Sequence, residues 1–152
     1  MPVETATITR PKVGVAVMVF KDGAALLGKR KSSIGLDQYG SPGGHLEHWE
    51  SFEDCARREV AEETGIEIGA TRFVCVMNNR EHAPHHYIMV ILAADWKSGE
   101  PRNLEPEKCA GWGWYGMDHL PAAMTPAMHT AFAALKSGLN YFDKIVSATV
   151  EA

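Results

Sequence analysis

The sequence predicts an α/β (mixed α+β) fold in which helices pack on the faces of a mixed sheet. Two observations support this prediction. Apolar runs of strand length are interspersed with two segments that have helical periodicity and clear capping residues. Hairpin turns as well as helices join the strands, so strict β-α-β alternation is absent and a mixed sheet is expected.

The first predicted strands form a hairpin. Residues 13–20 (VGVAVMVF) are almost wholly apolar and rich in β-branched side chains, which is typical of a buried strand. Lys21-Asp22-Gly23 is a turn signal, and residues 24–30 are predicted to form the returning strand. Further strands are expected at residues 71–78, 87–95 and 111–115.

A glycine-rich segment and two helices complete the predicted elements. Residues 31–50 are expected to form a long loop, and loops of that length in compact domains usually have a function. Ser51 can cap a helix that ends near Thr64, with Gly65 as its stop. Thr125-Pro126 opens a second helix, and Gly138 closes it.

Length and charge limit the classes of protein to consider. The 152 residues fit one domain over residues 13–152, preceded by a flexible N-terminal arm at residues 1–12. The net charge of −4 argues against a protein that coats DNA or RNA, because no basic stripe is available to displace counterions. It leaves open a small anionic substrate that is held by a metal ion.

Apolar runs and cysteines bear on the cellular location. No run approaches the roughly 18 apolar residues of a membrane helix, and the N-terminus shows no signal peptide. Cys55, Cys75 and Cys109 are widely spaced, which argues against a disulfide framework and a cysteine zinc site. A reducing cytoplasm is therefore the expected location, with no membrane partner.

The predicted helix at residues 51–65 carries acidic residues on its apolar side. Phe52, Ala56 and Val60 form an apolar stripe at helical spacing, and Glu59 and Glu63 project within it. A solvated acidic face would lie opposite that stripe. Crowded carboxylates repel one another, and a divalent cation with hard oxygen ligands, Mg²⁺ or Mn²⁺, would offset that repulsion.

Neighbouring residues extend this candidate metal site. Arg58 precedes Glu62 by four residues and can pair with it, which would fix the direction of the Glu62 carboxylate. Gly43 lies in a Pro-Gly-Gly segment that lets backbone approach a ligand closely, so its carbonyl is a candidate ligand. Glu50 is a fourth acid within reach of the first helical turn.

These residues resemble a known family. The pattern GX5EX7REUXEEXGU of the Nudix box, where U is aliphatic, is matched at every defined position by Gly44, Glu50, Arg58, Glu59, Val60, Glu62, Glu63, Gly65 and Ile66. The resemblance implies an α/β/α sandwich with a mixed central sheet. It also implies hydrolysis of a nucleoside diphosphate that is linked to a further group X.

The resemblance also implies roles for the site residues. Glu59 and Glu63 would be the main metal ligands, and Glu62 would be a ligand or the base that activates water. Arg58 would orient Glu62. The Gly43 carbonyl would be a further ligand, and Glu50 would act through water.

The similarity extends over residues 13–121 and is greatest to the MutT-like branch. Residues 28–35, 42–47, 50–65 and 103–115 resemble plant and human cytosolic Nudix enzymes that convert nucleoside triphosphates to a monophosphate and pyrophosphate. Members of that branch act on dGTP and on oxidised or otherwise modified nucleotides. The resemblance then implies that Arg30, Gly44, His45 and Lys108 contact the substrate and that the chain forms a homodimer. Glu105 and Glu107 are expected to lie in a solvated loop.

Alternative activities remain open. ADP-ribose, a dinucleoside polyphosphate or an isoprenyl diphosphate would use the same metal site with a different group X. A Nudix module that binds a nucleotide without turnover is a further alternative. Such modules often lose box glutamates, and this chain has lost none.

The chain departs from its relatives at three places near the box. Trp49 stands where many relatives have glycine, and it is expected to pack on its loop rather than stack on substrate. Tyr39-Gly40-Ser41 replaces a Trp-x-Leu segment. Residues 124–128 lack the aromatic that can stack on a purine. Recognition of the base therefore stays open.

Two aromatic or histidine clusters have structural interpretations. His82, His85 and His86 could bind zinc, but a polar loop at the rim of a pocket is favoured, because no cysteine lies nearby. Trp112 and Trp114 share one face of a strand, where core packing or a dimer contact is favoured over base stacking.

Overall fold

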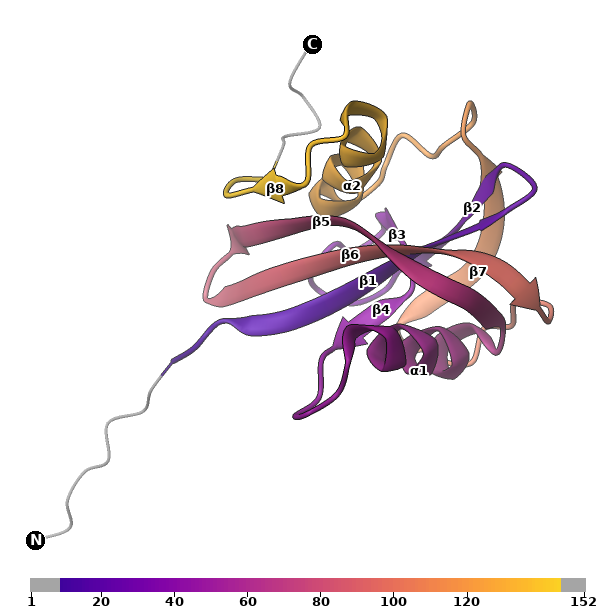
Figure 1. Cartoon of the computed structure of the whole chain (residues 1–152), viewed down its shortest axis with the longest axis horizontal. Helices are drawn as coiled ribbons and strands as arrows, with labels where there is room; N and C mark the ends of the chain where they lie inside the picture. The colour runs from indigo at the N-terminus through magenta and orange to yellow at the C-terminus, as the bar shows by residue number, and fades with distance from the viewer. Residues whose placement is uncertain (1–8, 146–152) are drawn as a thin grey trace, which may run out of the picture.

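The computed structural model describes residues 9–145 as eight strands and two helices (Figure 1). The strands are β1 (Lys12–Lys21), β2 (Ala24–Arg30), β3 (Tyr39–Gly40), β4 (Gly43–His45), β5 (Glu67–His82), β6 (His85–Ser98), β7 (Cys109–Gly116) and β8 (Tyr141–Phe142). The helices are α1 (Phe52–Thr64) and α2 (Pro126–Ser137). Residues 1–8 lie outside the described residues, so the arm at residues 1–12 stays a prediction.

The strands form one mixed sheet, which confirms the predicted fold class. Its order is β3-β2-β1-β6-β5-β8, with β4 also paired to β1 and β7 to β2. The long strand β1 runs parallel to β6 and antiparallel to β2 and β4. β1 therefore lies in the interior of the sheet, which explains its almost continuous apolar sequence.

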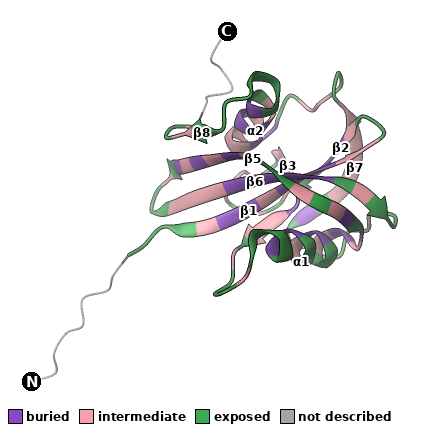
Figure 2. Ribbon diagram, viewed as in Figure 1, coloured by how far each residue is buried: buried purple, intermediate pink, exposed green. Residues whose placement is uncertain are grey.

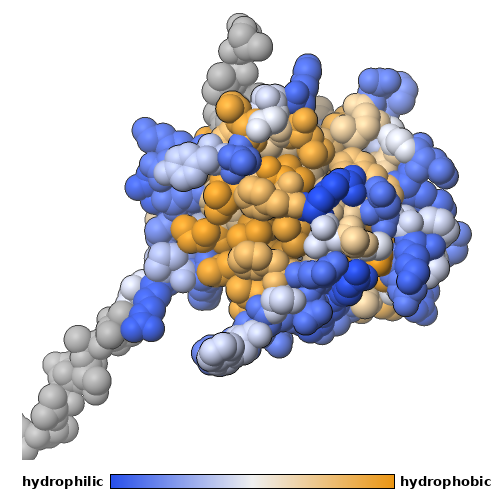
Figure 3. Space-filling view, viewed as in Figure 1, coloured by the Kyte–Doolittle hydropathy of each residue, from blue (hydrophilic) through white to orange (hydrophobic). Residues whose placement is uncertain are grey.

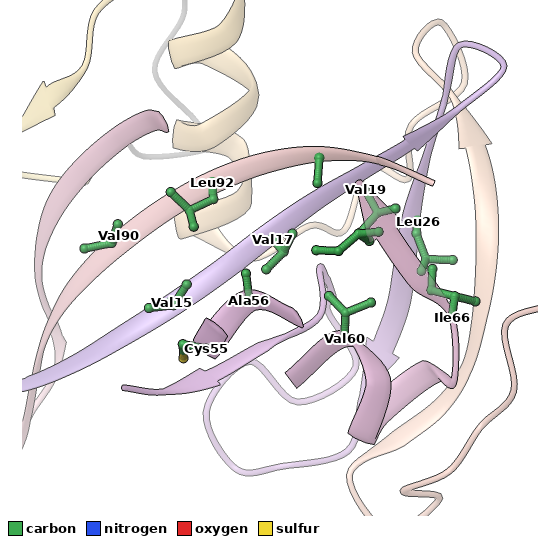
Figure 4. Packing of buried hydrophobic residues seen from close by; sticks show 12 residues of the cluster. Val15, Val17, Val19, Leu26, Cys55, Ala56, Val60, Ile66, Val90 and Leu92 are labelled. Carbon is green, nitrogen blue, oxygen red and sulfur yellow. The ribbon is translucent and has the colours of Figure 1, made fainter. Parts of the chain in front are cut away.

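The two helices cover opposite faces of the sheet, so the architecture is an α/β/α sandwich (Figure 1). Alternate residues of a strand point to opposite faces. Val15, Val17 and Val19 of β1 accordingly join the core on the α1 side, which Figure 4 shows from close by. Met18 joins the core on the α2 side, together with Met128.

Burial follows the same layers. Figure 2 shows buried positions along β1 and β6 and an exposed outer face on α1. Apolar side chains also gather on the surface over β5 and β6 (Figure 3), where Phe73 of β5 is 56% exposed. Among residues 9–145, no helix is long and apolar enough to cross a membrane.

The helices agree with their predicted bounds, because both caps are local features. The Ser51 side chain accepts a hydrogen bond from the Asp54 N–H, and Gly65 ends α1 in the left-handed conformation at φ 76°. Thr125 caps α2 in the same way, and Gly138 ends it at φ 78°.

The predicted loop at residues 31–50 is wrong in part, since it contains β3 and β4. The sequence of β4, Gly43-Gly44-His45, has low strand propensity, and its pairing with β1 makes it a strand. β5 and β6 also extend beyond their predicted apolar segments, because their hairpin continues to His82 and His85. β8 was not expected from the sequence.

Candidate active site

Helix α1 is anchored by its small and apolar residues. Cys55, Ala56 and Val60 are fully buried against the sheet. The expectation that Phe52 joins this stripe is wrong, because Phe52 is 47% exposed. Because this face packs on the sheet, the acidic residues on the adjoining side of the helix lie beside β4.

The glycines of β4 let the acids of α1 come against the backbone. A Cβ atom on Gly44 would overlap the carboxylate of Glu59. A Cβ atom on Gly43 would overlap the Val15 carbonyl of β1. The two glycines of the Pro-Gly-Gly segment therefore have different roles: Gly44 accommodates an acid of α1, and Gly43 allows close strand pairing.

The β1–β4 ladder sets the direction of the backbone groups of β4. The Pro42 carbonyl accepts a hydrogen bond from the Val17 N–H at 2.8 Å, and the Leu46 N–H donates to the Val13 carbonyl at 3.0 Å. Backbone groups alternate in direction along an antiparallel pair, so those of Gly43 and His45 point away from β1. The Gly43 N–H donates to Glu63 Oε2 at 3.4 Å, and its carbonyl lies on that same side.

Arg58 connects the acids of the site. Its Nε and Nη2 donate to the two carboxylate oxygens of Glu50 at 2.7 and 2.9 Å, and Nη1 donates to Glu59 at 2.8 Å. The contact with Glu62 is longer, at 3.4 Å. Arg58 therefore pairs with Glu62 as the spacing predicts, but its bidentate partner is Glu50, which was not expected from the sequence.

Charge and burial shift the proton affinities of two glutamates in opposite directions. The hydrogen bonds from Arg58 hold the pKa of Glu50 at about 2. Burial, followed by the charge of Glu59, raises the pKa of Glu63 to about 8, although the Gly43 N–H opposes this shift. Glu63 thus lies next to a second carboxylate in a poorly solvated place, where a cation would stabilise its charged form.

The residues present fit a divalent cation. Glu59 and Glu63 supply adjacent carboxylates, and Gly43 turns its backbone to the same side. Glu62 is 55% exposed and lies toward Arg58. Within residues 9–145, no three His, Cys, Asp or Glu side chains are already grouped around a cation site. Mg²⁺ is commonly bound by one or two carboxylates together with substrate phosphates, which matches this donor set.

Glu59 and Glu63 line an open cavity of about 640 Å³. Lys108 lies at its wall and forms an ion pair with Glu105 at 3.0 Å, which raises the pKa of Lys108. Glu105 also lines the cavity, and its charge contributes to the raised pKa of Glu63. The expectation of a solvated loop is therefore wrong for Glu105, whereas Glu107 is exposed.

A second cavity of about 230 Å³ adjoins the first. Its apolar wall includes Met89, Ile91 and Met128, and its polar groups include Asn79 and His82. Asn79 is only 8% exposed, and its side-chain oxygen accepts a hydrogen bond from the Glu81 N–H at 3.1 Å. Sequence reasoning missed Asn79, because no local pattern marks a lone asparagine in a strand as facing a cavity.

The two cavities share a border of six residues: Arg30, Gly40, Ser41, Gly43, Gly44 and His45. Arg30, Gly44 and His45, for which the resemblance implies contact with the substrate, therefore lie together at this border. Arg30 is held by hydrogen bonds to the Ile34 carbonyl and to Ser32 Oγ, both at 2.9 Å. The ring of His45 stacks on Tyr87 with centroids 5.6 Å apart.

Trp49 is not part of either cavity. It is 92% exposed, adopts φ 65° and makes an edge contact with His48. The expectation that Trp49 packs on its loop is therefore wrong.

The structure places the histidine cluster in the β5–β6 hairpin and the two tryptophans in β7. His82 and His85 face each other across the β5–β6 hairpin, and His82 lies at the wall of the smaller cavity. His86 is hydrogen-bonded to Asn78 at 2.6 Å. Trp112 and Trp114 pack against the α1-side core. The Trp112 indole also donates to the Glu63 carbonyl at 3.2 Å, which ties β7 to the end of α1.

The comparisons with known proteins agree on one family. The NUDIX domain family matches residues 9–135. NAD-capped RNA hydrolase NudC of Chromobacterium violaceum is 28% identical over 117 residues, which are 76% of this chain and 43% of that protein. The chain thus spans less than half the length of that relative. Oxidized purine nucleoside triphosphate hydrolase of Danio rerio is 28% identical over 116 residues, covering 72% of this chain and 69% of that protein.

A solved structure shares the fold. The crystal structure of a MutT Nudix hydrolase from Burkholderia pseudomallei has a TM-score of 0.79 and 33% sequence identity, and it covers 84% of this chain and 99% of that chain. The family match includes every residue of the box, from Gly44 to Ile66. The chain therefore belongs to the Nudix hydrolase family.

Proposed function

We propose that the chain hydrolyses nucleoside triphosphates of the dGTP or oxidised-nucleotide type to a nucleoside monophosphate and pyrophosphate, with Mg²⁺ as cofactor. The observation that carries this proposal is the pair of adjoining cavities. One holds the paired carboxylates of Glu59 and Glu63, and the other combines apolar walls with buried polar groups. A substrate that spans both would place its phosphates near the acids and its base in the smaller cavity.

Glu59 and Glu63, with the Gly43 carbonyl, would hold the cation, and Glu62 would join them or remain free for proton transfer. A bound Mg²⁺ neutralises the phosphates, polarises phosphorus and lowers the pKa of water. Mn²⁺ is the expected substitute, because it accepts the same oxygen ligands. The raised pKa of Glu63 and the close Gly44–Glu59 contact support this assignment.

The remaining side chains hold the metal-binding carboxylates in position or supply positive charge that neutralises the phosphates. Arg58 holds Glu59 in place while Glu50 holds Arg58 through both of its carboxylate oxygens. Lys108 and Arg30 supply positive charge at the cavity walls, where a phosphate chain carries negative charge. We assign proton abstraction to Glu62, because its carboxylate is 55% exposed and thus accessible to attacking water.

The smaller cavity supports a nucleoside over a hydrocarbon as group X. The wall of this cavity includes the polar side chains of Asn79 and His82, which offer hydrogen-bonding groups that a purely apolar isoprenyl chain could not use. A base offers hydrogen-bond donors and acceptors together with an apolar ring face. The relative from Danio rerio named as an oxidized purine nucleoside triphosphate hydrolase also supports this class of substrate.

The experiment is a substrate panel with Mg²⁺, in which pyrophosphate and orthophosphate are measured separately. The panel contains dGTP, 8-oxo-dGTP, dCTP, a dinucleoside polyphosphate, ADP-ribose and geranyl diphosphate. Release of pyrophosphate from the triphosphates is the expected result, and the ranking of rates identifies the base. The Glu63→Gln variant is the control, with an expected loss of about a hundredfold or more in turnover.

Other outcomes assign another function. Activity confined to ADP-ribose, to the dinucleoside polyphosphate or to geranyl diphosphate would retain the metal site and reject a nucleoside triphosphate as substrate. Tight nucleotide binding in calorimetry without any turnover would indicate a binding module. Near-normal activity of a folded Glu63→Gln variant would overturn the metal-ligand assignment.

We also propose a homodimer in a reducing cytoplasm. Beyond its β8 partners Val76 and Met77, β5 has a long open edge among the described residues, and Phe73 on that strand is 56% exposed. The three cysteines are buried free thiols, which suits a reducing compartment. A molar mass near 33 kDa in light scattering, twice the chain mass of 16.7 kDa, tests the dimer. Phe73→Glu is expected to lower that mass toward the monomer value.

A further inference from the structure

The hydroxyl of Ser41 is an unusual feature of the site. Its oxygen is buried, and within the described part of the chain it has no hydrogen-bond partner. A buried hydroxyl without a partner is unfavourable, because it has lost water and gained nothing in exchange. Such a group in a binding region is expected to find its partner on a ligand.

Ser41 stands where the two cavities meet. It is one of the residues that line both the acidic cavity and the smaller one. It lies between β3 and β4, with Gly40 paired to Gly28 of β2 on one side. On the other side, the Pro42 carbonyl accepts from the Val17 N–H at 2.8 Å. The sheet therefore fixes the backbone of Ser41, while no hydrogen bond restrains rotation of its hydroxyl.

The position determines which part of a substrate Ser41 can contact. A nucleotide with its phosphates near Glu59 and its base near Asn79 places its sugar at the border between the cavities. The phosphates have cationic partners in Arg30 and Lys108. A neutral hydroxyl donates one hydrogen bond and can also accept, and a sugar hydroxyl does the same.

We propose that Ser41 is a specificity-determining residue that hydrogen-bonds a hydroxyl of the substrate sugar. The inference rests on the proposed function, because it needs a nucleotide that spans both cavities. It deepens that function by naming the substrate class, which is nucleotides with a free sugar hydroxyl. Isoprenyl diphosphates, in which a hydrocarbon is attached directly to the diphosphate, would be disfavoured.

The test compares wild type and Ser41→Ala on dGTP and on 2′,3′-dideoxy-GTP, which lacks both sugar hydroxyls. Loss of the serine hydroxyl is expected to lower kcat/KM for dGTP by about ten- to hundredfold. For the dideoxy substrate, wild type and variant are expected to differ by less than about threefold, because the partner is already missing. Ser98→Ala, which removes a hydroxyl from the far end of β6, is the matched control and should leave both values unchanged.

Thermal unfolding separates this role from a structural one. Ser41→Ala removes an unpaired buried hydroxyl, so the ligand-free variant is expected to melt at the same temperature as wild type or higher. The rise in melting temperature on adding the non-hydrolysable α,β-methylene-dGTP should be smaller for the variant. A lower melting temperature of the ligand-free variant would show that the hydroxyl stabilises the fold and would overturn the proposal.

Two kinetic outcomes would also overturn it. An equal loss on dGTP and dideoxy-GTP places the contact on the phosphates or base, and no loss on either excludes a contact. If wild type hydrolyses no nucleotide, the proposed function fails. The α,β-methylene-dGTP titration then still decides whether Ser41 contributes to nucleotide binding, because it requires no turnover.

Discussion

The backbone of Gly44 lies against the carboxylate of Glu59, with no room for a side chain between them. Gly44 belongs to β4 and Glu59 to α1, so this contact joins the strand and the helix at the centre of the site. It explains in physical terms why the first position of the box is glycine. Any Cβ atom there would displace the carboxylate that is proposed to bind the cation.

Gly44→Ala is therefore expected to reduce turnover by about a hundredfold, since displacement of a reacting group by about 1 Å has effects of that size. Mg²⁺ affinity should fall as well, which calorimetry can measure. Gly69→Ala is the matched control, because a Cβ on Gly69 meets only an ordinary contact 3.6 Å away. Full activity of Gly44→Ala would show that Glu59 tolerates displacement and is not a ligand.

Metal affinity is expected to rise with pH. The pKa of Glu63 is about 8 in the fold, against an ordinary value of 4.5. The folded protein thus retains a proton between these pH values that the unfolded chain releases. Cation binding must displace that proton, so affinity for Mg²⁺ should increase up to about pH 8. Titration in buffers with different ionisation enthalpies measures the released proton.

The raised pKa of Glu63 also predicts how the stability of the metal-free protein varies with pH. Because the folded state binds the Glu63 proton more tightly, the free energy of unfolding should fall as pH rises from 4.5 to about 8. Glu63→Gln lacks this group, and its stability should be flatter over that range. Identical pH profiles for the two proteins would contradict the raised pKa.

Acid stability should depend on the Glu50–Arg58 pair. The pKa of Glu50 is held at about 2, so the pair stabilises the fold above about pH 4.5 and loses that effect as pH falls toward 2. Arg58→Lys cannot keep both hydrogen bonds, and its melting temperature should be a few degrees lower at pH 7. The deficit should shrink near pH 2.5.

Arg72→Lys provides the comparison for this pair. Its partner Asp95 is 3.5 Å away and both side chains are exposed, so a change in melting temperature close to zero is expected at either pH. An Arg58→Lys deficit that is independent of pH would mean that lost packing, rather than the ion pair, is responsible.

Trp49→Gly is expected to stabilise the protein. Trp49 is 92% exposed and adopts φ 65°, a conformation that glycine adopts without the steric cost of a Cβ. The gain should be up to about 1 kcal/mol in denaturant unfolding. Trp49→Ala retains the Cβ atom and should show no such gain. Equal stability of the two variants would show that the backbone conformation is not the cause.

Much of the site could be predicted from the sequence because its determinants are local. The caps at Ser51 and Gly65 define α1, and the helical spacing of Glu59 and Glu63 places both acids on one side of it. Gly43 and Gly44 precede the helix in a short segment. Residues this close along the chain have few alternative arrangements once the helix forms.

The tertiary structure decided the rest, because it depends on contacts between distant segments. Pairing with β1 makes a strand of β4 and turns the Gly43 N–H toward Glu63. The fold of the 105–108 loop brings Glu105 to the acidic cavity, where the sequence suggested only solvent. The tertiary structure also makes Glu50, rather than Glu62, the main hydrogen-bond partner of Arg58.

The smaller cavity shows the difference most clearly. Asn79 comes from β5, Thr125 from the cap of α2 and Ser41 from the segment before β4. The sequence by itself determined the family, the helix bounds and the carboxylate pair, since each depends on spacing within about twenty residues. Only packing of the sheet against α2 decided which polar groups lie in the cavity, because no pattern along the chain records a contact between segments so far apart.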